Sequence, residues 1–201
     1  MDLQKFIANL EKKQYTVRHF ATGKEAADYL DAAIDGTSVA FGGSVSVKQL
    51  QLDERLASHN EVVSHSRLKE GETPEECMQR AMNTEIYICS VNGAAESGEL
   101  VNIDGTGNRV ASTLFGHKKV YFIIGRNKLA ADLEGAIWRA RNISAPKNAQ
   151  RLQRRTPCAA KGDRCYDCDS PERICKGLVV HYEKIRSMEM EVVLVDEELG
   201  Y

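Results

Sequence analysis

Four cysteines near the C-terminal end of the chain could together hold a metal centre. Cys158, Cys165, Cys168 and Cys175 are spaced C-x6-C-x2-C-x6-C, with a central CxxC pair and one outer cysteine on each side. A segment with this spacing can bring four thiolates to one metal ion or iron–sulfur cluster. Zinc sites often combine two CxxC pairs, whereas a four-iron cluster is wider and accepts ligands from longer loops. We therefore expect a [4Fe-4S] cluster in preference to zinc, and unmetallated thiols remain a third interpretation.

The cysteine segment is also the most basic part of the chain. Residues 139–176 contain ten lysines and arginines against four aspartates and glutamates, although the whole 201-residue chain has a net charge of −2. Positive charge lowers the cost of clustered thiolates and also favours an anionic ligand. A solvated basic face without a ligand would have the same composition. Nucleic-acid binding is not expected, because aromatic side chains on which bases could stack are scarce here.

Glycine-rich segments upstream of the cysteines could bind a small anion. In residues 41–46, two glycines and two serines follow an apolar run, so backbone amides and hydroxyls could approach a phosphate or carboxylate. Residues 104–109 could fold back toward the same pocket. The predicted substrate- or anion-binding residues are Gly42, Gly43, Ser44, Ser46, Gly98, Asp104, Asn108 and Arg109, of which Arg109 would supply a countercharge. Tight turns with a serine cap would need the same residues, so spacing alone leaves both interpretations open.

Glu96 is the residue that we predict to be catalytic. It lies among small residues in the segment Ala95-Glu96-Ser97-Gly98, directly after a predicted strand. A carboxylate in that setting would be accessible and partly desolvated, which suits a base or a nucleophile. A loop glutamate that only accepts hydrogen bonds from turn amides would have the same sequence. The five histidines show no paired spacing that is typical of ligands.

Helices and strands that alternate along the chain must position these residues. Apolar periodicity and capping residues predict helices at 2–13, 22–34, 73–82, 128–141 and 148–155, and strands at 15–20, 37–41, 61–64, 85–90, 99–103, 120–124 and 191–196. We therefore expect one α/β domain over residues 1–201, with a mainly parallel sheet flanked by helices and a cysteine-rich metal-binding loop at 156–176. In such sheets, functional groups gather at the carboxyl ends of the strands.

The expected compartment is the cytoplasm. No run of about 18 apolar residues is available to span a membrane, and residues 1–5 lack the basic and then apolar pattern of a secretory signal. In a reducing compartment, clustered cysteines favour metal binding over disulfides. The expected partners are a small anionic metabolite, an iron–sulfur redox protein and a second copy of the chain.

Taken together, these segments resemble the LUD-domain family, which is named for lactate-utilisation proteins. The resemblance rests on residues 42–46, 95–101 and 104–109, and it continues through residues 120–125, 145–148, 156–158 and 191–200. The family is similar in fold to ribose-phosphate isomerases and CoA transferases. In CoA transferases a Glu-Asn-Gly tripeptide supplies a nucleophilic glutamate, and Glu96-Ser97-Gly98 is similar to it, with serine in place of asparagine.

The resemblance implies a function in lactate or related carboxylate utilisation. The chain would be an iron–sulfur-containing enzyme or enzyme subunit that acts on a small anionic metabolite, either an oxidoreductase component or a CoA-transferase-like enzyme. The alternative is a non-catalytic accessory protein with a structural zinc or iron–sulfur loop and a basic face that docks a partner.

Overall fold

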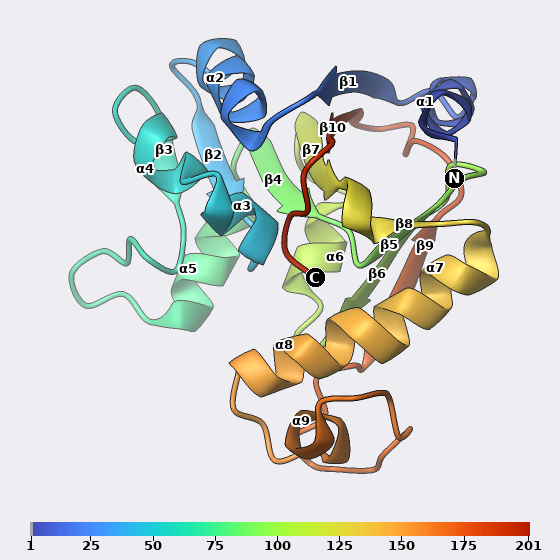
Figure 1. Cartoon of the computed structure of the whole chain (residues 1–201). Coiled ribbons are helices and arrows are strands. Elements are labelled where there is room, and N and C mark those ends of the chain that lie inside the picture. Colours follow the sequence, from blue (N-terminus) through green and yellow to red (C-terminus); the bar gives the residue numbers. More distant parts are fainter. Residues whose placement is uncertain (1) are drawn as a thin grey trace.

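The computed structural model describes residues 2–201, and its centre is a six-stranded parallel sheet (Figure 1). The strand order is β1-β10-β7-β4-β2-β3, and every neighbouring pair is parallel. These strands are β1 (Thr16–Phe20), β2 (Ser38–Phe41), β3 (Glu61–Val63), β4 (Ile86–Ser90), β7 (Lys119–Gly125) and β10 (Glu189–Val195). The predicted α/β class and mainly parallel sheet are confirmed. The chain order reverses between β2 and β4, and ligands bind to such sheets at the carboxyl ends of the strands beside a reversal.

Helices cover both faces of this sheet, and the alternation of side chains along β7 shows how. Phe122 and Ile124 pack in a cluster with α1 and α5, whereas Tyr121 and Ile123 pack with α2, α3 and α4. A strand buried on both faces must be apolar throughout, which is why the sequence identified β7. The helices are α1 (Leu3–Lys12), α2 (Gly23–Ala33), α3 (Val45–Gln49), α4 (Leu52–Leu56), α5 (Pro74–Ala81) and α6 (Asn108–Ser112). None of the helices in the described part of the chain is both long enough and apolar enough to cross a bilayer.

A second sheet, of four strands, was not predicted. Its order is β8-β5-β6-β9, with β5 (Gly93–Ala95), β6 (Leu100–Asp104), β8 (Leu129–Ala130) and β9 (Gly177–His181). We expected the strand at 99–103 to belong to the main sheet, but β6 pairs antiparallel with β5 and β9 instead. β5 and β8 span only three and two residues, so they are too short to show a periodic pattern.

The helix predicted at 128–141 begins later than expected. A 3-10 turn (Arg126–Lys128) and β8 come first, and α7 (Leu133–Arg139) starts after Asp132, whose Oδ1 accepts a hydrogen bond from Gly135 N at 2.7 Å. α7 continues through a π-helical turn (Ala140–Ser144) into α8 (Ala145–Arg151), which ends before the predicted residue 155 (Figure 1). The predicted start at residue 128 was wrong because the helix begins only after Asp132, which is its N-terminal cap. Lys128 therefore lies at the carboxyl end of β7.

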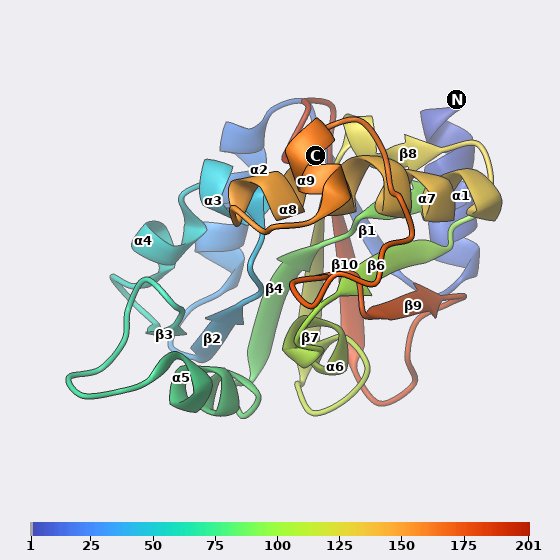
Figure 2. The ribbon, with the colours of Figure 1, turned by 90° about the horizontal axis from the view of Figure 1, so that it is seen from below.

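The cysteine-rich segment connects α8 to β9. We call residues 156–176 the Cys loop, and it contains one short helix, α9 (Pro157–Lys161). Figure 2 shows it beside α8 and reaching the ends of β6 and β9. Lys176 N donates to Asp104 O at 3.0 Å, and a Cβ atom on Gly105 would be 2.7 Å from Ile174 O. The Cys loop therefore packs closely against the turn that follows β6.

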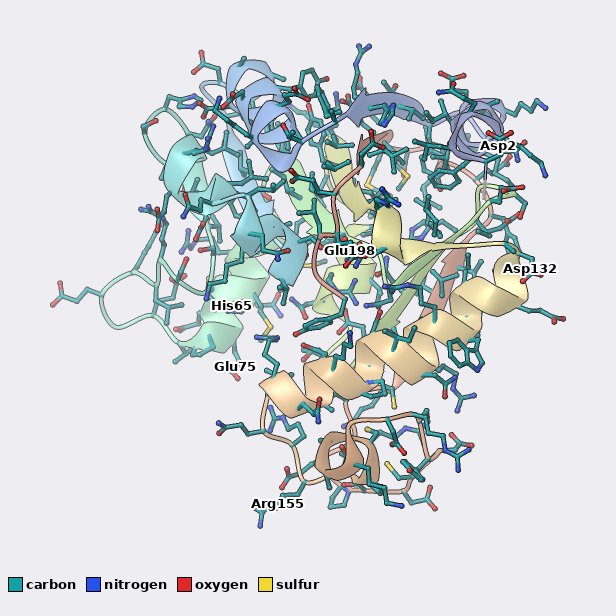
Figure 3. The ribbon with its side chains drawn as sticks, viewed as in Figure 1. Asp2, His65, Glu75, Asp132, Arg155 and Glu198 are labelled. Carbon is teal, nitrogen blue, oxygen red and sulfur yellow. The ribbon has the colours of Figure 1, made fainter. Side chains whose placement is uncertain are left out.

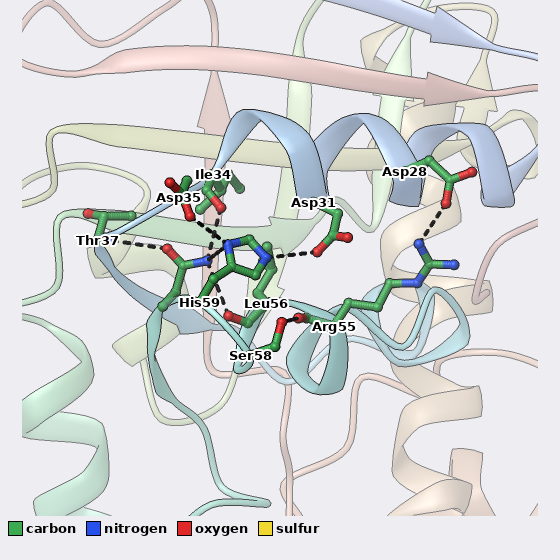
Figure 4. A network of polar contacts seen from close by, with 10 residues as sticks. Asp28, Asp31, Ile34, Asp35, Thr37, Arg55, Leu56, Ser58 and His59 are labelled. Atoms are coloured by element: carbon green, nitrogen blue, oxygen red, sulfur yellow. Dashed lines mark hydrogen bonds and ion pairs between the residues drawn. The ribbon is translucent and has the colours of Figure 1, made fainter.

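A polar network at the β3 edge of the main sheet joins α2 to the chain beyond α4 (Figure 4). The two ring nitrogens of His59 lie 3.0 Å from Asp31 Oδ1 and 3.0 Å from Asp35 Oδ1. Hydrogen bonds to these two carboxylates raise the pKa of His59. Asn60 Nδ2 donates to the carbonyl oxygens of Ile34 and Leu56. We assign this network to the packing of α2, since it holds the connection into β3.

Candidate functional site

A cavity of about 540 Å³ opens at the carboxyl ends of β2 and β4 and beside β7. Its inner wall is formed by residues 43–46 after β2, residues 90–92 at the end of β4, and Lys128 after β7. Residues 103–109, parts of α8 and the Cys loop form the other walls. The cavity lies where the strand order reverses, which is the usual place for a ligand in an open α/β sheet. Its volume falls in the range of roughly 300–1,000 Å³ that is typical of small-molecule sites.

Most of the predicted anion-binding residues meet in this cavity. Those that line it are Gly43, Ser44, Ser46, Asp104, Asn108 and Arg109. Gly42 stands beside the wall, where a Cβ atom would be 3.0 Å from the Arg109 side chain. Glycine at position 42 therefore leaves the room that Arg109 occupies.

The Arg109 side chain is held in the cavity wall mainly by uncharged oxygens. Its Nη2 donates to Ile103 O at 2.6 Å, and its Nη1 donates to Asn102 Oδ1. The Asp104 carboxylate lies 3.6 Å from Arg109 Nε, and it also accepts a hydrogen bond from Val110 N at 3.2 Å. The two hydrogen bonds to neutral oxygens fix the guanidinium in place. Because Asp104 lies 3.6 Å away and also holds the turn into α6, it balances the charge of Arg109 only in part.

Lys128 is the candidate functional residue that the sequence analysis missed. Its side chain is nearly buried, with 4% of the residue exposed, and its Nζ donates to Ser46 Oγ at 2.9 Å, Ser90 Oγ at 2.8 Å and Val91 O at 3.0 Å. All three acceptors are uncharged. Burial away from water, together with the positive charges of Arg139 and Arg109, lowers the pKa of Lys128 to about 7. The only sequence signal was its position just after a wholly apolar strand.

The cavity carries more positive than negative charge. Its basic lining residues are Arg109, Lys128, Arg154, Arg173 and Lys176, and its acidic ones are Asp104 and Glu172. Glu172 accepts hydrogen bonds from the Arg155 backbone N at 2.7 Å and Nε at 2.8 Å, and these contacts lower the pKa of Glu172. Both carboxylates are thus engaged by protein groups. The electrostatics of the cavity favour an anion.

Glu96 lies apart from the cavity, in the turn between β5 and β6. Its Oε1 is 2.6 Å from Lys5 Nζ, and its Oε2 accepts a hydrogen bond from Asp2 N at 3.0 Å. In Figure 3, Asp2 lies beside α1, far from His65, which lines the cavity. Gly98 is in the same region, since a Cβ atom there would be 2.8 Å from the Lys13 side chain. The structure therefore does not bring Glu96 or Gly98 to the other predicted site residues, and the catalytic role of Glu96 stays a prediction.

The four cysteines of the Cys loop are partly buried and lie among hydrogen-bond donors. Cys165 Sγ accepts a hydrogen bond from Asp167 N at 3.3 Å and lies 3.9 Å from Arg141 Nη2. These donor types suit a thiolate site. Within residues 2–201, however, no three Cys, His, Asp or Glu side chains form a group that could hold a metal ion. The ligands are appropriate in kind but do not converge here, so the predicted cluster and its zinc alternative stay predictions.

The family model described as LUD domain matches residues 3–195, nearly the whole chain. The chain belongs to the LUD-domain family. Among solved structures, this LUD-domain protein is similar to a DUF162 family protein from Deinococcus radiodurans, with a TM-score of 0.53 and 10% sequence identity over 96% of this chain and 95% of that chain. At that identity the likeness shows the fold alone. No curated protein matches the sequence.

Proposed function

We propose that this LUD-domain protein binds a small anionic metabolite in the cavity at the carboxyl edge of its parallel sheet. The observation that carries the proposal is the unbalanced positive charge there: Arg109 is held mainly by neutral oxygens, and Lys128 only by neutral oxygens. A carboxylate would complete the pairing that the protein leaves open. The family name directs us first to 2-hydroxy and 2-oxo carboxylates of the lactate type.

The cavity suits such a ligand because its charged groups are fixed before the ligand arrives. Arg109 is held in the wall by the carbonyl of Ile103 and the side chain of Asn102, so little side-chain entropy is lost on binding. Ser44 caps α3, with Val47 N donating to its Oγ at 3.4 Å, and it borders the same space. Preorganised donors of this kind bind charge more strongly than mobile surface side chains do.

We further propose that the protein is an enzyme subunit whose Cys loop holds an iron–sulfur centre beside the substrate. Support comes from the position of residues 171–174, which line the cavity and lie between Cys168 and Cys175. A cluster bound there would supply one-electron transfer. The protein's own part would be to place the anion against this wall and to offset thiolate charge through Arg141, which contacts the Cys loop, and Arg173, which lies within it.

The accessory-protein alternative is favoured by one observation on the outer surface. Trp138 is 59% exposed and lies with Tyr166 in a groove next to Cys165. Exposed aromatic side chains are enriched where proteins dock. A structural metal in the Cys loop would then shape a docking surface, and the cavity would not bind a carboxylate.

Calorimetric titration with lactate, pyruvate and malate separates these functions. Wild-type protein is expected to bind at least one of them, and Arg109→Gln is expected to weaken binding by roughly 10- to 100-fold, the value of one charge-assisted hydrogen bond. Arg154 lies at the exposed rim of the cavity, and Arg154→Gln should weaken binding less than Arg109→Gln does. If Arg109→Gln folds poorly, the affinity of Arg154→Gln still tests the site.

The control is Glu96→Gln, which removes a carboxylate charge outside the cavity. Affinity for the same ligand should remain as in the wild type. If Glu96→Gln abolishes binding while Arg109→Gln and Arg154→Gln do not, the ligand site is not this cavity.

A further inference from the structure

The surroundings of Lys128 differ from those of a buried lysine in an ion pair. Ser46 and Ser90 already donate their hydroxyl protons to Leu199 O and Ile123 O, so each presents lone pairs to Lys128 Nζ. An ammonium group would give one proton to each of its three oxygen neighbours. A neutral amine would give two protons, and its lone pair would face the third oxygen until that contact opens.

The charges around Lys128 oppose the ammonium form. Burial lowers the pKa of Lys128 most, and the positive charges of Arg139 and Arg109 add to the shift, which brings the pKa to about 7. The amine and ammonium forms are therefore both populated near neutral pH. A lysine that is desolvated and adjacent to other cations is the usual form of a nucleophilic lysine.

Lys128 borders the open cavity on one side and the backbone of Gly200 on another. Gly200, at φ +63°, passes so close that a Cβ atom there would be 3.3 Å from Lys128 Nζ and 2.7 Å from Ser46 Oγ. On the neighbouring wall, a Cβ atom on Gly43 would meet nothing within 4 Å. Ser46, Ser90 and Val91, which hold Nζ, all line the cavity. Lys128 Nζ thus lies at the boundary of the space that we assign to the anion.

We propose that Lys128 condenses with the carbonyl carbon of a 2-oxo acid whose carboxylate occupies the positively charged cavity. The inference rests on the proposed function and adds a substrate class and a covalent step to it. The Nζ lone pair forms the C–N bond while the carbonyl π electrons move to oxygen, and proton transfer from nitrogen to oxygen gives a carbinolamine. The nitrogen lone pair then forms the C=N bond as the C–O bond breaks, and the departing hydroxide takes the second amine proton and leaves as water. The amine and the carbonyl thus give an imine and water without any oxidant or reductant. The protonated imine can withdraw electrons from the adjacent carbon.

Reductive trapping tests this step. The whole protein is incubated with pyruvate and sodium cyanoborohydride, digested, and examined by peptide mass spectrometry. The expected result is a carboxyethyl group on Lys128. Lactate has the carboxylate but no carbonyl, so it should slow this labelling by competition. Lys128→Arg should lose the label, whereas Lys147→Arg, which changes an exposed lysine of α8 that does not line the cavity, should keep it.

Two outcomes would overturn the inference, and they differ in what they say about the proposed function. If Lys128 stays unmodified, or label appears only on exposed lysines such as Lys147, while carboxylates still bind, the imine is wrong and the anion site stands. If no carboxylate binds and Lys128 is not labelled, both are wrong. The labelled residue is identified by mass spectrometry in the wild-type protein, so the test does not depend on whether the Lys128→Arg variant folds.

Discussion

The unfolding free energy of the wild type, measured relative to that of Lys128→Met, is expected to rise by about 4 kcal/mol between pH 7 and pH 10.5. In the native protein, burial and the neighbouring guanidinium groups hold the pKa of Lys128 near 7, below its ordinary value of 10.5. The unfolded chain therefore binds a proton over an interval in which the native protein does not. Methionine has a similar length and binds no proton, so the stability of the Lys128→Met variant lacks this dependence on pH.

The sign follows from proton linkage. Above pH 10.5 the amine is neutral in both states and contributes nothing. As the pH falls toward 7, protons stabilise only the unfolded state, at about 1.4 kcal/mol per pH unit, and the loss is complete below the native pKa. Ser46, Ser90 and Val91 accept hydrogen bonds from Lys128 and oppose part of this loss, because they favour the ammonium form.

Urea denaturation at a series of pH values measures the difference directly. Lys176→Met is the matched control, because Lys176 borders the same cavity but is exposed. Its difference from the wild type should stay level across the interval. A level difference for Lys128→Met as well would mean that Lys128 keeps its ordinary pKa, and the environment described for it would be wrong.

Protein purified without oxygen is expected to contain about one metal centre per chain, and Cys165→Ser is expected to lose most of it. The reason is that a serine hydroxyl is a much weaker ligand than a thiolate for iron or zinc. Iron with matching sulfide, measured by elemental analysis, together with an electron paramagnetic resonance signal on reduction, would identify the cluster. Stoichiometric zinc would instead support the accessory-protein alternative.

Cys77→Ala is the control for that measurement. Cys77 lies in α5 and is buried against β2 and β3 of the main sheet, outside the Cys loop, so its replacement should leave the metal content unchanged. Because the Cys loop forms a cavity wall, we also expect Cys165→Ser to weaken carboxylate binding. Wild-type protein that is purified without oxygen and contains no metal would contradict the metal site. A metal content in Cys165→Ser equal to that of the wild type would also contradict it.

The central sheet could be predicted because its strands are buried on both faces. β7 is apolar from residue 120 to 124 and β10 from residue 192 to 195, and that pattern needs no knowledge of their neighbours. The segments at 41–46 and 104–109 line the same cavity, although β2 and β6, which they follow, belong to different sheets. The second sheet could not be predicted, since its pairing depends on contacts between β6 and β9, which are far apart in the sequence.

Glu96 and Lys128 show why a local pattern is not enough to locate a site. Glu96 follows a strand and lies among glycines, yet β5 and β6 turn it toward α1 and Lys5. Lys128 was placed in a helix, where its periodicity indicated nothing unusual. Its burial follows from the 3-10 turn after β7 and from Ser46 and Ser90, which come from distant parts of the chain.

A crystal structure of the protein grown with a saturating 2-oxo or 2-hydroxy carboxylate would test the assignment of the anion site most directly. We predict density for the carboxylate inside the cavity, facing Arg109, with its carbonyl or hydroxyl end toward Lys128. Density for the ligand beside Glu96 and Lys5, or a cavity that holds only water at a concentration where calorimetry shows binding, would contradict the account.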